Sequence, residues 1–341
     1  MQQGRKIRVL VVDDSIVFRE VLSRGISSDE HIEVVATAID PYDARDKIIE
    51  YKPDVMTCDV EMPKMNGIEF IRRLIPQYPL PVIIVSSVNG AVFDALDAGA
   101  VDFVAKPDVK SAASVENFVN EMIEKVKIAS SARIIPERDN NLQGKVAFDE
   151  KQNPSRIIAI GASTGGTEAI YSVVKSLPVN TPGIVIVQHI PPVFSRMFAE
   201  RLNSSTNLDV KEAKTGDFVA RGRVLIAPGD SHMKIVRIGD QYKVHCFKGD
   251  RVNGHCPSVD VLFDSVAREA GGEAVGVILT GMGYDGAKGL LAMKKAGART
   301  IGQDEQSSVV YGMPKVAYNI GAVEKQASLE NIPRMIFRML G

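Results

Sequence analysis

The sequence lacks the marks of several protein classes. Its three cysteines, Cys58, Cys246 and Cys256, cannot all pair and form no C-x-x-C motif, so we expect reduced thiols rather than a disulfide framework. A net charge of −1 gives no overall attraction to nucleic acid or to an anionic membrane. No apolar run is long enough to span a bilayer, and the short run at 9–12 ends in aspartates. We therefore expect a cytoplasmic protein with no signal peptide, no nucleic-acid partner and no direct membrane insertion.

The sequence pattern of residues 1–128 predicts a first domain. Short apolar runs alternate there with segments of helical spacing, in five successive strand–helix units. Such a series is typical of a doubly wound parallel sheet. The predicted strands are 7–12, 33–38, 54–58, 82–85 and 102–105, and the predicted helices are 15–27, 41–51, 67–75, 91–98 and 114–128.

Residues 129–154 predict a linker, because they contain Ser-Ser, Pro136 and Asn-Pro and lack a sustained apolar period. A second α/β pattern fills residues 155–341. Its predicted parallel strands are 156–160, 184–188 and 274–280, with shorter β-rich pieces at 223–227, 234–238 and 243–247, and helices at 259–270 and 285–296. Gly239-Asp240 predicts a β-hairpin between the last two pieces. The fold class is therefore α/β, with two doubly wound domains: a five-stranded parallel sheet, then a mostly parallel sheet with a hairpin.

Acidic side chains follow two strands of the first predicted sheet. Asp13 and Asp14 come directly after the first strand, and Asp59 follows the third. In a parallel sheet these positions share the carboxyl edge, and a cluster of carboxylate oxygens suits a hard divalent cation such as Mg²⁺. Ser86 and Lys106 end the next two strands and can contact a phosphoryl group, while an aspartate can accept phosphate covalently. Taken singly, each aspartate could equally be a turn or helix N-cap residue.

These residues carry a family resemblance. Asp13 and Asp14, Asp59 in Cys-Asp-Val-Glu-Met-Pro, Ser86 and Lys106 in Lys-Pro together resemble a response-regulator receiver domain. The resemblance implies that Asp59 takes phosphate from a histidine kinase in a Mg²⁺-dependent reaction. It also places Phe103 at the family's aromatic switch position, although by itself Phe103 is a core candidate.

A serine follows the first strand of the second domain. Gly161-Ala162-Ser163-Thr164-Gly165 fits the G-x-S-x-G turn that exposes a nucleophilic hydroxyl. His189 follows the second parallel strand and can act as base, and Asp285 follows the third and can orient it. The backbone N–H groups of Thr164 and of Met282 or Gly283 are candidates for an oxyanion hole.

Other interpretations of these residues stay open. The turn at 161–166 could cradle a phosphate, although it lacks the Gly-Lys-Ser/Thr of a P-loop. Asp285 could only cap the following helix. His232 is a competing base, ranked second because its loop follows a strand predicted outside the main parallel set, and His255 ranks third. Cys246, His255 and Cys256 lack zinc-site spacing.

The second domain also resembles a family. The stretches 160–169, 187–192, 257–263 and 280–287 resemble, in order, motifs of the chemotaxis protein-glutamate methylesterase/glutamine deamidase family. The resemblance implies a serine hydrolase with Ser163, His189 and Asp285 as nucleophile, base and acid. It implies glutamyl methyl esters and glutamines on chemoreceptor cytoplasmic domains as substrate, a chemotaxis histidine kinase as phosphodonor, and no cofactor for hydrolysis. We expect a monomer.

Two further functions remain possible from the sequence. The chain could be a phospho-switched binding protein with a catalytically inactive esterase-like domain, or a general serine esterase for small soluble esters. A transcriptional response regulator lacks support, because the sequence shows no helix-turn-helix and no basic stripe.

Overall fold

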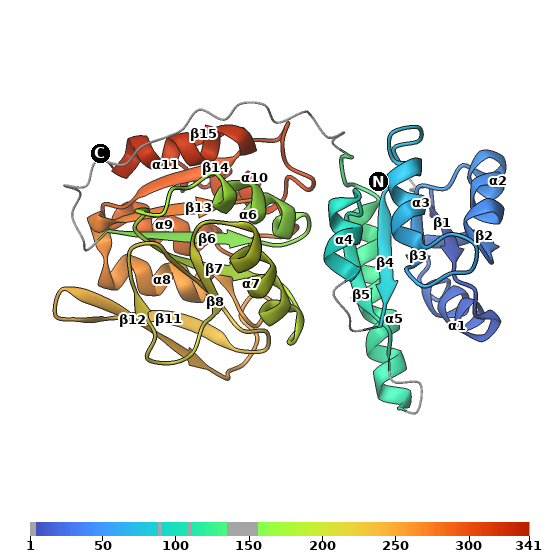
Figure 1. The fold of residues 1–341 in the computed structure, drawn as a ribbon, viewed down its shortest axis with the longest axis horizontal. Helices are drawn as coiled ribbons and strands as arrows, with labels where there is room; N and C mark the ends of the chain where they lie inside the picture. Colours follow the sequence, from blue (N-terminus) through green and yellow to red (C-terminus); the bar gives the residue numbers. More distant parts are fainter. Residues whose placement is uncertain (1–4, 88–90, 108–110, 135–155, 341) are drawn as a thin grey trace. The chain divides into compact units, whose positions relative to one another are not determined.

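The protein is described by a computed structural model that covers residues 5–87, 91–107, 111–134 and 156–340. It divides into two compact units, Met1–Arg138 and Asp139–Gly341 (Figure 1). Residues 135–155, most of the predicted linker, lie outside the described residues. Among the described residues, no helix combines the length and the apolar character that crossing a bilayer requires.

The first unit is a five-stranded parallel sheet in the order β2-β1-β3-β4-β5. Helices α1 and α5 cover one face of the sheet and α2, α3 and α4 the other, as a doubly wound fold requires. The elements are β1 Ile7–Val12, α1 Ile16–Ile26, β2 Ile32–Ala38, α2 Pro41–Tyr51, β3 Val55–Asp59, α3 Gly67–Leu74, β4 Val82–Ser86, α4 Ala91–Asp97, β5 Asp102–Ala105 and α5 Ala112–Ala129.

Local capping explains why these helices begin close to their predicted residues. The side chain of Ser15 accepts a hydrogen bond from the Phe18 N–H, and that of Asp40 accepts from the first turn of α2. Asn66 caps α3 in the same way. Ser15 and Asp40 come within three residues of the end of the preceding strand, so a polar residue there marks the switch from strand to helix.

The second unit is built on a seven-stranded sheet in the order β15-β14-β13-β6-β7-β10-β8, and every pairing in it is parallel. Helices α8, α9 and α10 cover one face, and α6, α7 and α11 cover the other. The elements are β6 Ile157–Ala162, α6 Gly166–Lys175, β7 Gly183–Gln188, α7 Phe194–Ser205, β8 Asp209–Glu212, β9 Phe218–Val219, β10 Arg223–Ile226, β11 His232–Ile238, β12 Gln241–Phe247, α8 Val259–Glu269, β13 Ala274–Ile278, α9 Ala287–Lys295, β14 Arg299–Gln303, α10 Met313–Asn319, β15 Lys325–Ala327 and α11 Ile332–Leu340.

The predicted hairpin is present, and it belongs to a small sheet of its own. Strands β11 and β12 pair antiparallel and β9 adds a third strand. Helix α8 contacts both β11 and the large sheet, so it lies between the two sheets (Figure 1). Its Phe263 is fully buried in the core cluster of this unit.

One predicted placement is wrong. The piece at 223–227 was expected outside the main parallel set, but β10 pairs parallel with β7 in the large sheet. The reason is the intervening chain: α7 provides the crossover that a parallel neighbour needs, and β8 then extends the edge.

We predict that Phe263→Ala lowers the free energy of unfolding by about 3–5 kcal/mol, because truncation leaves a cavity between the two sheets. Urea unfolding of the full chain, followed by circular dichroism, measures the change. Phe218→Ala is the matched control, since Phe218 is 39% exposed and should change stability by less than about 1 kcal/mol. Equal effects of the two substitutions would contradict this account of the core.

Candidate functional site

The candidate nucleophile and base lie at the ends of adjacent strands. Ser163 directly follows β6 and His189 directly follows β7, and β6 and β7 pair up to Ala162 and Gln188. Asp285 lies on the other side of β6, in the turn between β13 and α9. Because the strands are parallel, all three residues come to one edge of the sheet.

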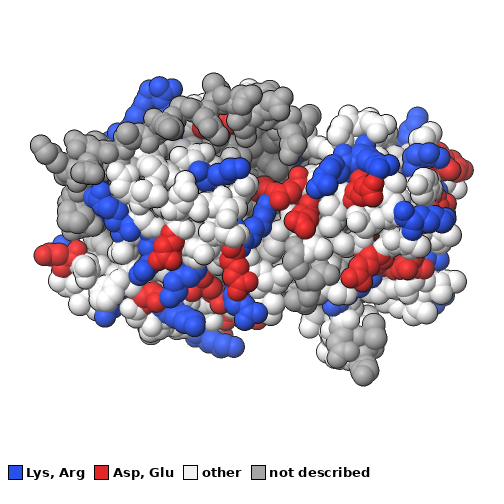
Figure 2. Space-filling model, in the orientation of Figure 1, with Lys and Arg blue, Asp and Glu red and all other residues white. Residues whose placement is uncertain are grey.

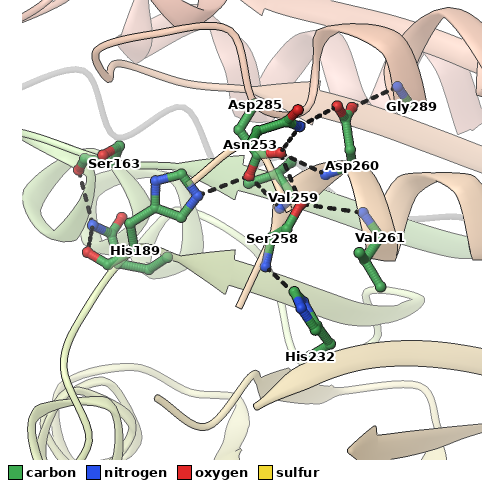
Figure 3. A network of polar contacts seen from close by, with 11 residues as sticks. Ser163, His189, His232, Asn253, Ser258, Val259, Asp260, Val261, Asp285 and Gly289 are labelled. Atoms are coloured by element: carbon green, nitrogen blue, oxygen red, sulfur yellow. Dashed lines mark hydrogen bonds and ion pairs between the residues drawn. The ribbon is translucent and has the colours of Figure 1, made fainter. Parts of the chain in front are cut away.

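The structure brings His189 and Asp285 into direct contact. His189 Nε2 lies 2.9 Å from Asp285 Oδ2, and both side chains are buried. A carboxylate only accepts hydrogen bonds, so Nε2 is the donor in this contact and carries a proton. The other ring nitrogen, Nδ1, has no hydrogen-bond partner among the described residues and faces the Ser163 side of the ring (Figure 3). It is therefore an unused acceptor beside the serine.

Asp285 is buried but held as an anion. Burial favours the neutral acid, yet the hydrogen bond and charge of His189, with further hydrogen bonds from Asn253 and Ser258, lower the pKa of Asp285 to about 2. The Val259 N–H donates to Oδ2 at 2.6 Å, and the Asp260 N–H donates to Oδ1 at 3.3 Å. With this lowered pKa, the Asp285 carboxylate is ionised at neutral pH.

Backbone contacts fix the serine turn. The Ser163 N–H donates to Thr280 O at 3.0 Å, and the Ser163 carbonyl accepts from the Gly166 N–H at 2.7 Å. Gly281 packs so closely that a Cβ there would lie 2.6 Å from Ser163 Cβ. The turn is thus tied to β13 on one side and to its own helix on the other.

Gln188 ties the serine turn to the histidine turn. Its Nε2 donates to Ser163 O at 2.8 Å and to His189 O at 3.2 Å (Figure 3). Sequence analysis did not single out Gln188 or Asn253. Gln188 could have been suspected, as a polar residue ending an apolar strand, whereas nothing links Asn253 to a site 32 residues away.

The two predicted oxyanion-hole residues lie beside the serine. Thr164 is buried, and its carbonyl accepts a hydrogen bond from Thr280 Oγ1 at 3.0 Å. Met282 follows Gly281 and is 46% exposed. Their role as amide donors to a substrate stays a prediction.

The two competing histidines have other contacts. His232 is buried, with Nε2 donating to Asp250 O at 2.9 Å and Nδ1 accepting from the Ser258 N–H at 3.2 Å. Both ring nitrogens therefore hold the chain at 250–258. The His255 ring stacks on the His189 ring, with 3.7 Å between the centroids. It supports the ring plane of His189.

The predicted acidic residues of the first unit also lie close together. Asp13, Asp14 and Asp59 offer carboxylate oxygens that all lie within 4.8 Å of one another. Lys106 Nζ lies 2.6 Å from Asp59 Oδ2 and 3.1 Å from Asp13 Oδ2. Gly67 approaches this site closely, since a Cβ there would lie 2.1 Å from the Asp59 carbonyl oxygen.

The charges of this acidic cluster fit a divalent cation. Burial is the main cause that raises the pKa of Asp13, and the charge of Asp59 adds to it against the opposing charge of Lys106. Burial disfavours the charged form of Lys106, but its hydrogen bond to Asp59 and the nearby carboxylates raise the pKa of Lys106. One lysine thus contacts two of the three carboxylates, and the three together form a hard oxygen donor set that can bind a divalent ion.

The remaining predicted residues of this unit, Ser86 and Phe103, are both buried. Ser86 ends β4, is buried, and donates from Oγ to Ser87 O at 2.9 Å. Phe103 on β5 is buried with its ring 5.3 Å from Lys125 Nζ. Lys106 Nζ also lies 4.8 Å from the centre of the Phe18 ring on α1.

Comparisons with known proteins agree with both units. The profile of the CheB methylesterase family matches residues 158–336, and that of the response regulator receiver domain matches residues 9–114. A protein-glutamate methylesterase/protein-glutamine glutaminase 2 of Syntrophomonas wolfei is 59% identical over 339 residues, 98% of each chain. A protein-glutamate methylesterase/protein-glutamine glutaminase of Syntrophotalea carbinolica is 52% identical over 346 residues, 97% of each chain. The crystal structure of the Thermotoga maritima CheB methylesterase catalytic domain is 38% identical, with a TM-score of 0.53 over 54% of this chain and 98% of that one.

The burial of His255 against His189 leads us to predict that the free energy of unfolding depends on pH. Burial, with the neighbouring His189, lowers the pKa of His255 from 6.5 to about 4. Between these pH values the unfolded chain binds a proton that the folded chain excludes, so stability falls as the pH drops from about 6.5 toward 4. His255→Phe keeps a ring for stacking and removes this titration, so it should lose less stability than the parent between pH 7.5 and pH 5.

Urea unfolding at the two pH values measures that difference. His245→Phe replaces a histidine on β12 whose ring stacks on Phe247, and as the control it should follow the parent. If His255→Phe also followed the parent, His255 would not be the group that titrates.

Proposed function

The chain belongs to the CheB methylesterase family, and we propose that Ser163, His189 and Asp285 are its catalytic triad. It is a receiver-regulated protein-glutamate methylesterase/protein-glutamine glutaminase. The observation that carries the proposal is the 2.9 Å contact between His189 Nε2 and Asp285 Oδ2, with His189 Nδ1 left facing the serine. The relatives are named as enzymes, so the alternative of an inactive esterase-like domain is not supported.

The proposed reaction is acyl transfer to Ser163. His189 Nδ1 takes the hydroxyl proton as Ser163 Oγ attacks the γ-carbonyl carbon of a glutamyl methyl ester. The N–H groups of Thr164 and Met282 stabilise the oxyanion. The imidazolium returns its proton to the leaving oxygen, the C–O bond breaks and methanol departs.

Water completes the cycle. His189 removes a proton from water, the hydroxide attacks the acyl-enzyme, and the C–O bond to Ser163 breaks as that proton passes to Ser163 Oγ. The free γ-carboxylic acid then loses its remaining proton to solvent and leaves as the carboxylate. Asp285 stabilises the imidazolium in both steps because its carboxylate stays ionised. A glutamine side chain reacts by the same steps and releases ammonia, since it also presents an acyl carbon.

The receiver unit supplies regulation, and we assign phosphorylation to Asp59. An Asp59 oxygen attacks the phosphorus of a kinase phosphohistidine, the P–N bond breaks and an acyl phosphate forms. Mg²⁺ held by Asp13, Asp14 and Asp59 would neutralise charge on the phosphoryl oxygens. Lys106 and Ser86 are placed to contact those oxygens, and Phe103 is the proposed switch residue. The acyl phosphate carries a charge of about −2 in place of the −1 of the carboxylate, and this change biases the receiver toward its active state.

The proposed partners follow from this chemistry. The substrate residues lie on the cytoplasmic domains of chemoreceptors, the phosphodonor is a chemotaxis histidine kinase, and the enzyme acts as a cytoplasmic monomer. Figure 2 shows Lys or Arg and Asp or Glu side chains interspersed on the face drawn, which supports a protein without a nucleic-acid partner. The hydrolytic reaction needs no cofactor in this scheme.

We predict that Ser163→Ala abolishes methanol release from methylated chemoreceptor, lowering kcat by at least about 10³-fold because the acyl-enzyme cannot form. The assay compares the parent with this variant on receptor-containing membranes. Ser204→Ala, on the exposed surface of α7, is the control and should match the parent. Equal release from Ser163→Ala and the parent would exclude Ser163 as nucleophile. Activity on small soluble esters alone would favour a general esterase.

We predict that Asp59→Asn removes activation by acetyl phosphate, because an amide cannot accept the phosphoryl group. Methanol release with and without acetyl phosphate and Mg²⁺ measures the activation ratio, which should fall to about 1. Asp46→Asn makes the same change at an exposed residue of α2 and should keep the parent's ratio. Full activation of Asp59→Asn would rule out Asp59 as acceptor.

A further inference from the structure

A second buried carboxylate lies behind the triad and takes no part in the mechanism above. Asp260, in the first turn of α8, is 5% exposed. Its Oδ1 accepts from the Gly289 N–H of α9 at 2.6 Å, and its Oδ2 accepts from Asn253 Nδ2 at 2.7 Å (Figure 3). Burial, together with the charge of Asp285, raises the pKa of Asp260. Two carboxylates buried close together repel each other unless hydrogen-bond donors lie between them.

Asn253 supplies those donors to both carboxylates at once. Its Nδ2 donates to Asp260 Oδ2 and to Asp285 Oδ1, each at 2.7 Å. This orientation of the amide follows from its partners, because the reversed amide would set an oxygen against two carboxylates. Asn253 has φ 54°, a left-handed conformation that asparagine adopts more readily than most residues.

The contacts of Asp285 are divided between its two oxygens. Oδ1 accepts from Asn253, from Ser258 Oγ at 2.8 Å and from the Asp260 N–H at 3.3 Å. Oδ2 accepts from His189 and from the Val259 N–H. Hydrogen bonds on Oδ1 fix the rotation of the carboxylate, and that rotation decides where Oδ2 meets the imidazole. Asn253 reaches Asp285 from a loop that shares no strand with the triad.

We propose that Asn253 is a positioning residue, which separates the Asp285 and Asp260 carboxylates and holds Asp285 in the orientation that His189 requires. The inference rests on the proposed function of the triad. Asn253 touches no reacting atom and acts only through Asp285. Its amide provides two donors at every pH, whereas a carboxylate or a neutral imidazole at this position could not.

The charged and titratable groups around this network come from several elements. His189 contacts Asp285, and His255 stacks on His189 and remains neutral above about pH 4, the value to which burial lowers the pKa of His255. The others are Arg251, which acts on His255, Asp264, which acts on Asp260, and His232, which binds the Ser258 N–H. These groups are the same in the parent and in the Asn253 variants. The ratio of variant to parent activity at one pH therefore reports the effect of residue 253 alone.

The test compares Asn253→Asp with Asn253→Gly in the full chain, since aspartate and glycine both tolerate the left-handed backbone. In Asn253→Asp a third carboxylate replaces the donors, so kcat at pH 8.5 should fall about 10- to 100-fold. At pH 5.5 the crowded carboxylates share a proton, and a protonated carboxyl donates one hydrogen bond again. The ratio of variant to parent activity should therefore rise about 10-fold between pH 8.5 and pH 5.5.

Asn253→Gly lacks any donor at either pH. Its kcat should fall by a similar factor at pH 8.5, and its ratio to the parent should stay flat with pH. KM should change less than about two-fold in both variants, because residue 253 does not contact substrate. Asn319→Asp, an exposed position at the end of α10, makes the same change of charge and should follow the parent throughout.

Proton NMR of the His189 Nε2–H provides a second readout that needs no substrate. The downfield signal of this proton should shift or vanish in Asn253→Asp at pH 8.5 and return at pH 5.5. A pH-independent ratio for Asn253→Asp with an unchanged signal, or parental kcat in Asn253→Gly, would overturn the inference. If the parent released no methanol, the proposed function would fail instead, and the NMR signal would still test the contact.

Discussion

A buried carboxylate that must stay ionised is the constraint on which the catalytic unit depends. Removing a charge from water carries a large penalty unless hydrogen bonds replace the lost solvent. Asp285 meets this demand with donors from His189, from the chain at 253–258 and from the backbone at the start of α8. Helix α8 is packed between the two sheets, and His232 binds the Ser258 N–H. Both contacts keep these donors in place.

The receiver unit handles buried carboxylates in the opposite way. Asp13 and Asp59 face a lysine, and the group is left with more negative than positive charge. Such a site gains by binding a cation and then a phosphoryl group, whereas the Asp285 site is already saturated and gains nothing from either. Hydrogen-bond donors saturate Asp285 but leave the acidic cluster with unbalanced negative charge. This difference explains why the acidic cluster can exchange ligands, whereas Asp285 keeps fixed partners.

The sequence predicted what depends on local signals. Buried parallel strands appear as unbroken apolar runs, and polar caps mark the following helices, so β1, β5 and α2 were predicted with the bounds they have. The residues that directly follow those strands, such as Ser163 and His189, could be placed for the same reason. Strands β8 and β15 are short and largely polar edge strands, and they carry no such signal. The place of β10 in the large sheet and the contacts of Asn253 depend on long-range packing, which a local pattern does not encode.

The pairing of β6 with β7 sets the placement of the proposed nucleophile and base. Ser163 and His189 each come one residue after the paired positions Ala162 and Gln188, at the ends of neighbouring strands whose backbones lie about 4.8 Å apart. This distance is a property of the peptide hydrogen bond, and no loop length enters it. The surrounding loops can therefore lengthen, shorten or change composition in the course of evolution while the reacting pair keeps its geometry, so that substrate range and chemistry can diverge independently.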